Sequence, residues 1–272
     1  MKQKFTLLIA VALVTALYTS CKKDATVTEK KQSTGIDQAT LARKMATSLY
    51  KSFSTQFSST GKAADLKVSG NAGCGLATIT PTDITVINGD TTRKITGNAV
   101  LTTLCSENEW VVDAYTLHDT LKTVDTGTGF VNTYINTQYY NVKGPASEAM
   151  PIAGRITTGQ NLRRFTPNGM TNEFHDLNMI YNFSSLVINP FATGNKFVMG
   201  KIDFTGQTVD LSPAIPTGYF SGYQGFIYYI NNTARIYFRN TEVQGGYTRY
   251  IMDFATGQMS GPVNSYPFPV DM

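Results

Sequence analysis

The residues best suited to acid–base chemistry lie around the single tryptophan of the chain. Glu107 and Glu109 precede Trp110, and Asp113 follows three residues later. Many glycosidases cleave sugar bonds with a pair of carboxylates. An aromatic side chain beside such acids is typical of sugar-binding sites. The two glutamates fall in an expected loop just after Cys105, where carboxylates are ordinarily solvated. A non-enzymatic protein is therefore favoured. A glycan-processing hydrolase or accessory protein, with carboxylates on separate strands, is the alternative.

The sequence gives little support to nucleophilic catalysis or to metal binding. His118-Asp119 and His175-Asp176 are adjacent pairs, and neighbours on a strand point to opposite faces, so neither pair predicts a catalytic dyad. The stretch Gly218-Tyr-Phe-Ser-Gly222 lacks the spacing of a hydrolase nucleophile elbow. The chain has two histidines and three cysteines without a CxxC pair. We expect no metal site and no cofactor.

The N-terminal residues predict export. Lys2 and Lys4 precede an apolar run from Phe5 to Leu17, which ends in Tyr-Thr-Ser and then Cys21. A positive start, an apolar run too short to span a bilayer and a small-residue exit are typical of a secretory signal. Residues 1–21 are therefore expected to be a signal peptide with its terminal cysteine.

With Cys21 directly after Thr19 and Ser20, this segment resembles a bacterial lipoprotein signal, although Tyr18 stands where the family usually has an aliphatic residue. The resemblance implies cleavage before Cys21 and attachment of acyl chains such as palmitate to it. Each buried methylene adds about 0.8 kcal/mol of membrane affinity. Residues 22–34 (KKDATVTEKKQST) have the composition of a flexible tether. An ordinary secretory peptide is the alternative.

The signal and tether are similar to those of Bacteroidetes-type lipoproteins that carry a β domain of unknown function. Surface-exposed lipoproteins of these bacteria tend to have an acidic run after the cysteine, whereas Lys22-Lys23-Asp24 follows here. The resemblance therefore implies an outer-membrane anchor in the cell envelope, and a periplasm-facing position is favoured over surface exposure.

Cys74 and Cys105 are the two remaining cysteines. In an exported chain we expect them to form a disulfide, which would stabilise the fold by about 3–4 kcal/mol in the chain-entropy model. Two buried, reduced thiols are the alternative.

The charge balance argues against nucleic acid. The chain has 23 Lys+Arg against 19 Asp+Glu, and removal of Lys2 and Lys4 leaves a net charge of about +2. Charged residues make up 15% and aromatic residues 11% of the chain, a composition that supports a packed core.

One helix is expected, within residues 35–60. Apolar residues recur at steps of three and four between Ile36 and Phe57, including Ala42, Met45 and Leu49. A stripe of this kind more often packs on its own sheet than on a partner protein.

Residues 61–272 are expected to form one β-rich domain. Runs rich in Val, Ile, Thr and Tyr alternate with turn-forming segments such as Asn88-Gly-Asp90. The expected strands are 76–88, 91–104, 110–118, 130–143, 152–165, 174–188, 196–204, 217–230, 233–239 and 247–254. Short turns and the lack of further helices predict a mainly β fold, an antiparallel meander that forms a curved sheet or a partly open barrel.

Aromatic residues are the remaining functional signal. We single out Trp110, Tyr219, Tyr223 and Tyr228 as a possible ligand or partner surface, with ordinary core packing as the alternative. Together these observations predict an envelope-anchored binding or scaffold module. Besides the membrane, which it would reach through its acyl chains, its expected partner is a small apolar ligand, a glycan or an envelope protein.

Overall fold

The computed structural model describes residues 38–57, 75, 77–105, 112–143, 149–189, 198–212, 215–230, 232–241 and 246–265. Of residues 51–57, 112, 198, 212, 215–219 and 264–265 it describes the backbone alone. Cys21, Cys74, Glu107, Glu109 and Trp110 lie outside these ranges.

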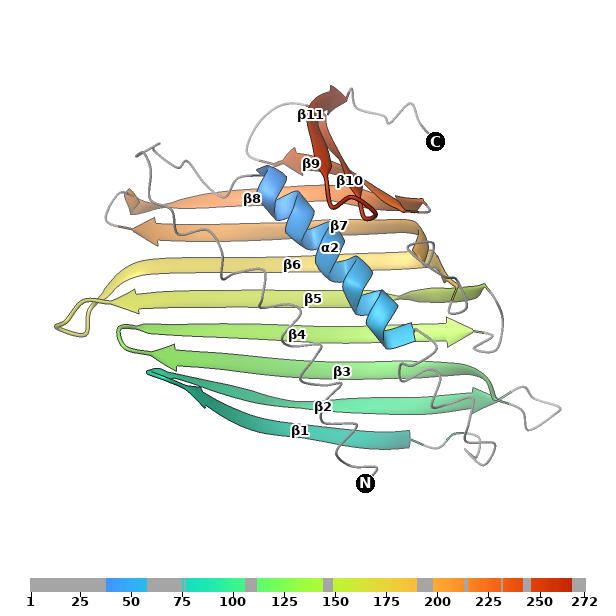
Figure 1. Ribbon diagram of the computed structural model, residues 1–272, viewed down its shortest axis with the longest axis horizontal. Coiled ribbons are helices and arrows are strands. Elements are labelled where there is room, and N and C mark those ends of the chain that lie inside the picture. Colours follow the sequence, from blue (N-terminus) through green and yellow to red (C-terminus); the bar gives the residue numbers. More distant parts are fainter. Residues whose placement is uncertain are drawn as a thin grey trace.

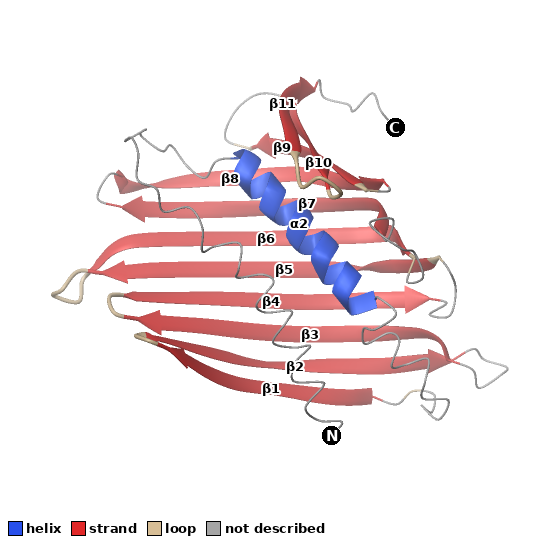
Figure 2. Ribbon diagram, in the orientation of Figure 1, coloured by secondary structure: helices blue, strands red, loops and turns tan. Residues whose placement is uncertain are grey.

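The described chain is one helix followed by one antiparallel sheet (Figures 1 and 2). The helix is α2 (Gln38–Phe57). The strands are β1 (Ala77–Asn88), β2 (Thr91–Cys105), β3 (Val112–Gly127), β4 (Phe130–Lys143), β5 (Met150–Phe165), β6 (Thr171–Ile188), β7 (Val198–Ser212), β8 (Ile215–Ile230), β9 (Thr233–Asn240), β10 (Tyr247–Asp253) and β11 (Met259–Ser265).

The eleven strands pair in chain order, and every pair is antiparallel. The predicted meander is confirmed, and the sheet is not closed into a barrel, so β1 and β11 are its two edges. Each edge strand contains a proline, Pro81 in β1 and Pro262 in β11. Because proline cannot donate a backbone hydrogen bond, it is tolerated on edge strands and discourages their pairing with other chains.

Tight turns set the register of the hairpins. Asn88 pairs with Thr91, and the two residues between them, Gly89 and Asp90, make the turn. Gly89 has a φ of 57°, which a glycine adopts without a steric penalty.

The sequence missed three parts of the sheet, one of them the second half of β7, which runs to Ser212 where the predicted strand ended at Phe204. It ended the third strand at His118, whereas β3 continues to Gly127. Charged residues there hid the strand pattern, but Asp125 forms an ion pair with Arg93, its partner on β2. It also missed β11, whose Gly-Pro dipeptide is unusual in a strand and is accommodated because β11 is an edge.

Helix α2 runs diagonally across one face of the sheet (Figure 1) and contacts β7, β9, β10 and β11. We call this side the helix-bearing face. The buried side of α2 consists of Leu41, Ala42, Met45, Ala46, Leu49 and Tyr50. The expectation that the apolar stripe packs on the protein's own sheet is therefore confirmed for these residues.

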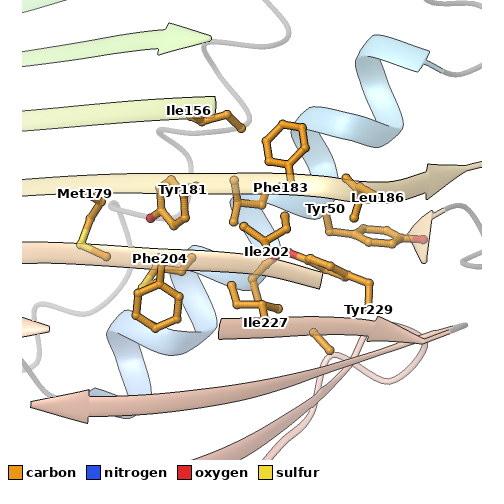
Figure 3. Close-up of a cluster of buried hydrophobic side chains, with 14 of the residues drawn as sticks. Tyr50, Ile156, Met179, Tyr181, Phe183, Leu186, Ile202, Phe204, Ile227 and Tyr229 are labelled. Atoms are coloured by element: carbon orange, nitrogen blue, oxygen red, sulfur yellow. Dashed lines mark hydrogen bonds between the residues drawn. The ribbon is translucent and has the colours of Figure 1, made fainter. Parts of the chain in front are cut away.

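The core fills the space between α2 and the sheet (Figure 3). Alternate residues of neighbouring strands, among them Phe183, Ile202 and Ile227, point to this face and are buried. Tyr229 donates a hydrogen bond of 2.9 Å to the carbonyl oxygen of Ala46, which joins β8 to the helix. Burial of the Tyr229 phenol raises its pKa well above the usual value of 10.0, because ionisation would place a charge in the core.

Candidate binding surface on the open face of the sheet

The opposite face of the sheet carries no helix in the described part of the chain, and we call it the open face. The strand register assigns residues to it. One row crosses the sheet from strand to strand, and each residue in it pairs with the next. The central row consists of Ile79, Val100, His118, Tyr139, Arg155, Asn182, Asp203, Phe226, Tyr237, Arg249 and Val263.

An exposed tyrosine lies in the middle of this row. Tyr139 is 50% exposed, and its ring meets the His118 ring edge-on, with 6.3 Å between centroids and an angle of 73°. Arg155, the partner of Tyr139 on β5, is exposed as well. A ring with one open side beside a guanidinium and an imidazole offers both a stacking surface and hydrogen-bond donors.

Threonine side chains form a second row beside the first. Thr120, Thr137 and Thr157 are consecutive register partners on β3, β4 and β5. The hydroxyl oxygens of Thr120 and Thr137 are 3.4 Å apart. Each hydroxyl can donate and accept, so this row can exchange hydrogen bonds with a polar ligand lying across the strands.

A cluster of rings covers the β7–β9 side of the open face. Phe226 stacks on Tyr237 at 4.6 Å, and Tyr228 meets Phe226 edge-on at 5.4 Å. The Lys201 ammonium lies 5.1 Å from the Phe226 centroid and forms an ion pair of 2.9 Å with Asp203. Tyr237 is only 1% exposed, although it points away from the helix. The cluster therefore packs as a small second core on this face.

The aromatic residues singled out in the sequence are separated by the structure. Tyr223 is 3% exposed on the helix-bearing face and packs on Phe238 at 5.0 Å, whereas Tyr228 lies half-buried on the open face. These two tyrosines therefore cannot belong to one surface. Tyr219 is placed in β8 by its backbone alone, and Trp110 lies outside the described residues.

The sequence alone did not single out Tyr139 as a surface residue. It identified Tyr139-Tyr140 as an aromatic pair, and alternation along β4 separates them. Tyr140 is fully buried, and its hydroxyl donates a hydrogen bond to the side-chain oxygen of Gln138. Tyr139 is exposed on the other face. The strict alternation of a strand was the signal that could have found this residue.

Of the three acidic residues considered near Trp110, only Asp113 falls within the described residues, where it is exposed in β3. Three acidic residues form ion pairs with a neighbouring cation, Asp125 with Arg93, Glu173 with Arg164 and Asp203 with Lys201, and Asp210 contacts the His175 ring. The bond between Arg93 and Asp125 is bidentate, at 2.7 and 2.9 Å. Arg93–Asp125 and Arg164–Glu173 join neighbouring strands, whereas Lys201 and Asp203 both lie on β7. A catalytic acid would need a carboxyl group that is held protonated.

His175 and Asp210 form a pair that sequence reasoning missed. They are register partners on β6 and β7, and the Nδ1 atom of His175 meets a carboxylate oxygen of Asp210. The expectation that His175-Asp176 makes no dyad stands, because the register brings a different aspartate to this histidine. Ser221 belongs to the stretch Gly218–Gly222, which lacks the spacing of a nucleophile elbow. Its side chain is fully buried and accepts a hydrogen bond of 2.9 Å from the side-chain amide of Asn240.

The described ranges contain neither a cluster of metal-ligating side chains nor a helix suited to span a membrane. Among these residues, no three His, Cys, Asp or Glu side chains gather as a metal site would require. Helix α2 is 20 residues long but is not apolar enough to cross a bilayer.

Cys105 ends β2, and Cys74 lies outside the described residues. The next residue, Gly75, donates a backbone hydrogen bond of 3.0 Å to the carbonyl oxygen of Thr103. This bond places the chain just after Cys74 close to the end of β2. The disulfide stays a prediction.

No known protein family, curated protein or solved structure matches this chain.

Proposed function

We propose that this chain is a non-enzymatic lipoprotein of the bacterial cell envelope, and that the open face of its sheet binds a glycan. Acyl chains on Cys21 would anchor it to the outer membrane, with the domain facing the periplasm. The observation that carries the glycan proposal is the exposed Tyr139 ring between His118 and Arg155, beside a row of threonine hydroxyls. Sugar rings present apolar C–H faces and polar edges, and this arrangement offers a partner for each.

An apolar ligand held between the helix and the sheet is less well supported. That space is filled by the protein's own side chains, such as Phe204 and Phe238, whose ring centroids are 5.3 Å apart. The ion-paired carboxylates in turn favour a binding protein over the alternative of a hydrolase.

Anchoring is tested separately from binding. Cys21→Ser in the full chain should abolish incorporation of labelled palmitate and release the protein from envelope fractions. Cys105→Ser serves as a control for the loss of a cysteine elsewhere, and it should leave labelling intact. Equal labelling and partitioning of Cys21→Ser and the wild type would refute the anchor.

Binding is tested with Tyr139→Ala. The mature domain would be assayed by affinity electrophoresis and by co-sedimentation with purified peptidoglycan, polygalacturonate and dextran. We expect at least one of these glycans to bind, and loss of the ring to weaken its affinity by about tenfold, as for an aromatic contact of about 1–1.5 kcal/mol. Tyr139→Phe should retain most of the affinity.

Phe220→Ala is the matched control. Phe220 is 51% exposed on the same face, so Phe220→Ala removes a ring of similar exposure that lies outside the central row. Equal losses in Tyr139→Ala and Phe220→Ala, or no binding of any of the three glycans by the folded wild type, would contradict the proposal.

A further inference from the structure

The two faces of the sheet carry opposite charge. On the open face, nine cationic side chains stand against four acidic ones. The cations are Lys94, Lys122, Lys143, Arg155, Arg163, Lys201, Arg235, Arg239 and Arg249, and the acids are Asp83, Asp176, Asp203 and Asp253. On the helix-bearing face, the paired strand residues include Arg93 and Arg164 against Asp119, Asp125, Glu173 and Asp210.

The sequence as a whole hides this asymmetry, because its total charge is nearly balanced. Strand alternation sorts the charges: Arg163 and Arg164 are neighbours in β5, yet they point to opposite faces. Arg164 forms an ion pair of 3.0 Å with Glu173 on its face, whereas Arg163 lies over the Phe174 ring at 5.7 Å on the open face.

Five of the nine cations of the open face are accessible. Lys94, Lys122, Lys143, Arg155 and Arg163 are all exposed. They lie on strands β2 to β5, which also carry His118 and Tyr139. A broad surface with an excess of one sign of charge attracts counter-charged polymers and raises their association rate.

We infer that the open face selects glycans that carry negative charge, such as carboxylate-bearing polysaccharides. This inference rests on the proposed function and names its ligand class. The rings and hydroxyls would contact sugar units, while lysine and arginine side chains neutralise the acidic groups along the polymer. Charge complementarity between the open face and the polymer supports this occupant.

The test uses two polymers with the same backbone. Polygalacturonate carries a carboxylate on each unit, and methyl-esterified polygalacturonate has those charges removed. We expect the mature chain to bind the acidic polymer at least tenfold more tightly at 20 mM salt, and the preference to shrink strongly at 300 mM salt, where exposed charges are screened.

Two double variants with the same net charge test whether the open face is responsible for the preference for the acidic polymer. Lys94→Gln/Lys122→Gln removes two exposed cations from the open face, outside the central row, and should weaken binding of the acidic polymer about fivefold at low salt. Arg43→Gln/Lys44→Gln removes two exposed cations from α2, beyond the opposite face. This control has the same net charge and should bind like the wild type.

The outcomes separate this inference from the proposed function. Equal, salt-insensitive binding of both polymers would overturn the charge inference and leave glycan binding intact. Equal losses in the two double variants would also overturn it, because net charge and not the open face would then be responsible. If neither polymer binds and peptidoglycan and dextran do not bind either, the proposed function fails, whereas binding of dextran alone would overturn only the charge inference.

Binding to an anionic lipid surface is tested with vesicles of one part phosphatidylglycerol to three parts phosphatidylcholine. Met199, Phe220 and Ile230 are exposed on the open face, so an anionic bilayer could also be attracted. Binding to these vesicles without binding to the acidic polymer would overturn the inference in favour of a lipid surface.

Discussion

Phe204 on β7 and Phe238 on β9 touch each other across the strand that separates them. Their ring centroids are 5.3 Å apart, and the residue between them in the register is Gly225 of β8. The same arrangement recurs where Tyr140 on β4 meets Phe183 on β6 at 5.7 Å above Gly154 of β5. A missing side chain on the middle strand therefore lets large rings from both neighbours close the core.

Gly225→Ala should destabilise the fold. A methyl group at this position would collide with the carbonyl oxygen of Tyr237 and with the Phe204 ring, and neither can move without disturbing the sheet. We expect the free energy of unfolding to fall by about 2–3 kcal/mol, as measured by urea denaturation.

Gly159→Ala is the matched control, because it adds the same methyl group to a strand on the open face. That methyl would meet only the flexible Asn178 side chain. We expect it to be neutral or slightly stabilising. A Gly225→Ala protein as stable as Gly159→Ala would contradict the packing role of Gly225.

The buried tyrosines predict alkaline sensitivity. Burial raises the pKa of Tyr115, Tyr181 and Tyr229 above 10.0, so in the folded state they stay protonated where the unfolded chain ionises. Their contribution to stability is therefore full below pH 10 and is lost as the pH rises above it. Urea unfolding between pH 8 and 11 should show this loss.

Tyr229→Phe isolates one of these groups. It removes the hydrogen bond to Ala46 and should cost about 1 kcal/mol at pH 8. Above pH 10 its stability should fall less steeply than that of the wild type, by up to about 1.4 kcal/mol per pH unit. Parallel slopes for Tyr229→Phe and the wild type would refute the assignment.

The predicted Cys74–Cys105 disulfide has a direct readout. Alkylation of the denatured, unreduced mature domain should leave both cysteines unmodified, and reduction should lower its unfolding free energy by about 3 kcal/mol, since the loop spans about 30 residues. The hydrogen bond from Gly75 to Thr103 places the chain beside Cys74 near this site. Two alkylated cysteines without a reductant would show that the bridge is absent.

Pro81 should limit association through the edge of the sheet. Its replacement in Pro81→Thr restores a backbone donor in β1, an edge strand whose Ile79 and Ile87 are exposed. We expect concentration-dependent dimers or larger species by light scattering. Thr85→Val raises strand propensity on the same strand and keeps the proline, so it should stay monomeric. Identical behaviour of the two variants would show that the proline does not protect this edge.

Local patterns in the sequence determined much of the sheet. Turn chemistry and β-branched runs predicted β4 with its observed bounds, and alternation placed Ala234, Ile236 and Phe238 together on the buried side of β9. These features depend on neighbouring residues alone, and therefore a single chain reveals them. The helix was predicted for the same reason, and it begins at Gln38 and ends at Phe57.

Only the tertiary structure decided which distant residues meet. Asp210 reaches His175 from another strand, and Phe204 of β7 meets Phe238 of β9 across β8. β11 forms although its own sequence disfavours a strand, because β10 supplies a partner. The charge of the open face emerges only when the register aligns eleven strands, since long-range pairing, and not local propensity, determines which side chains share a surface.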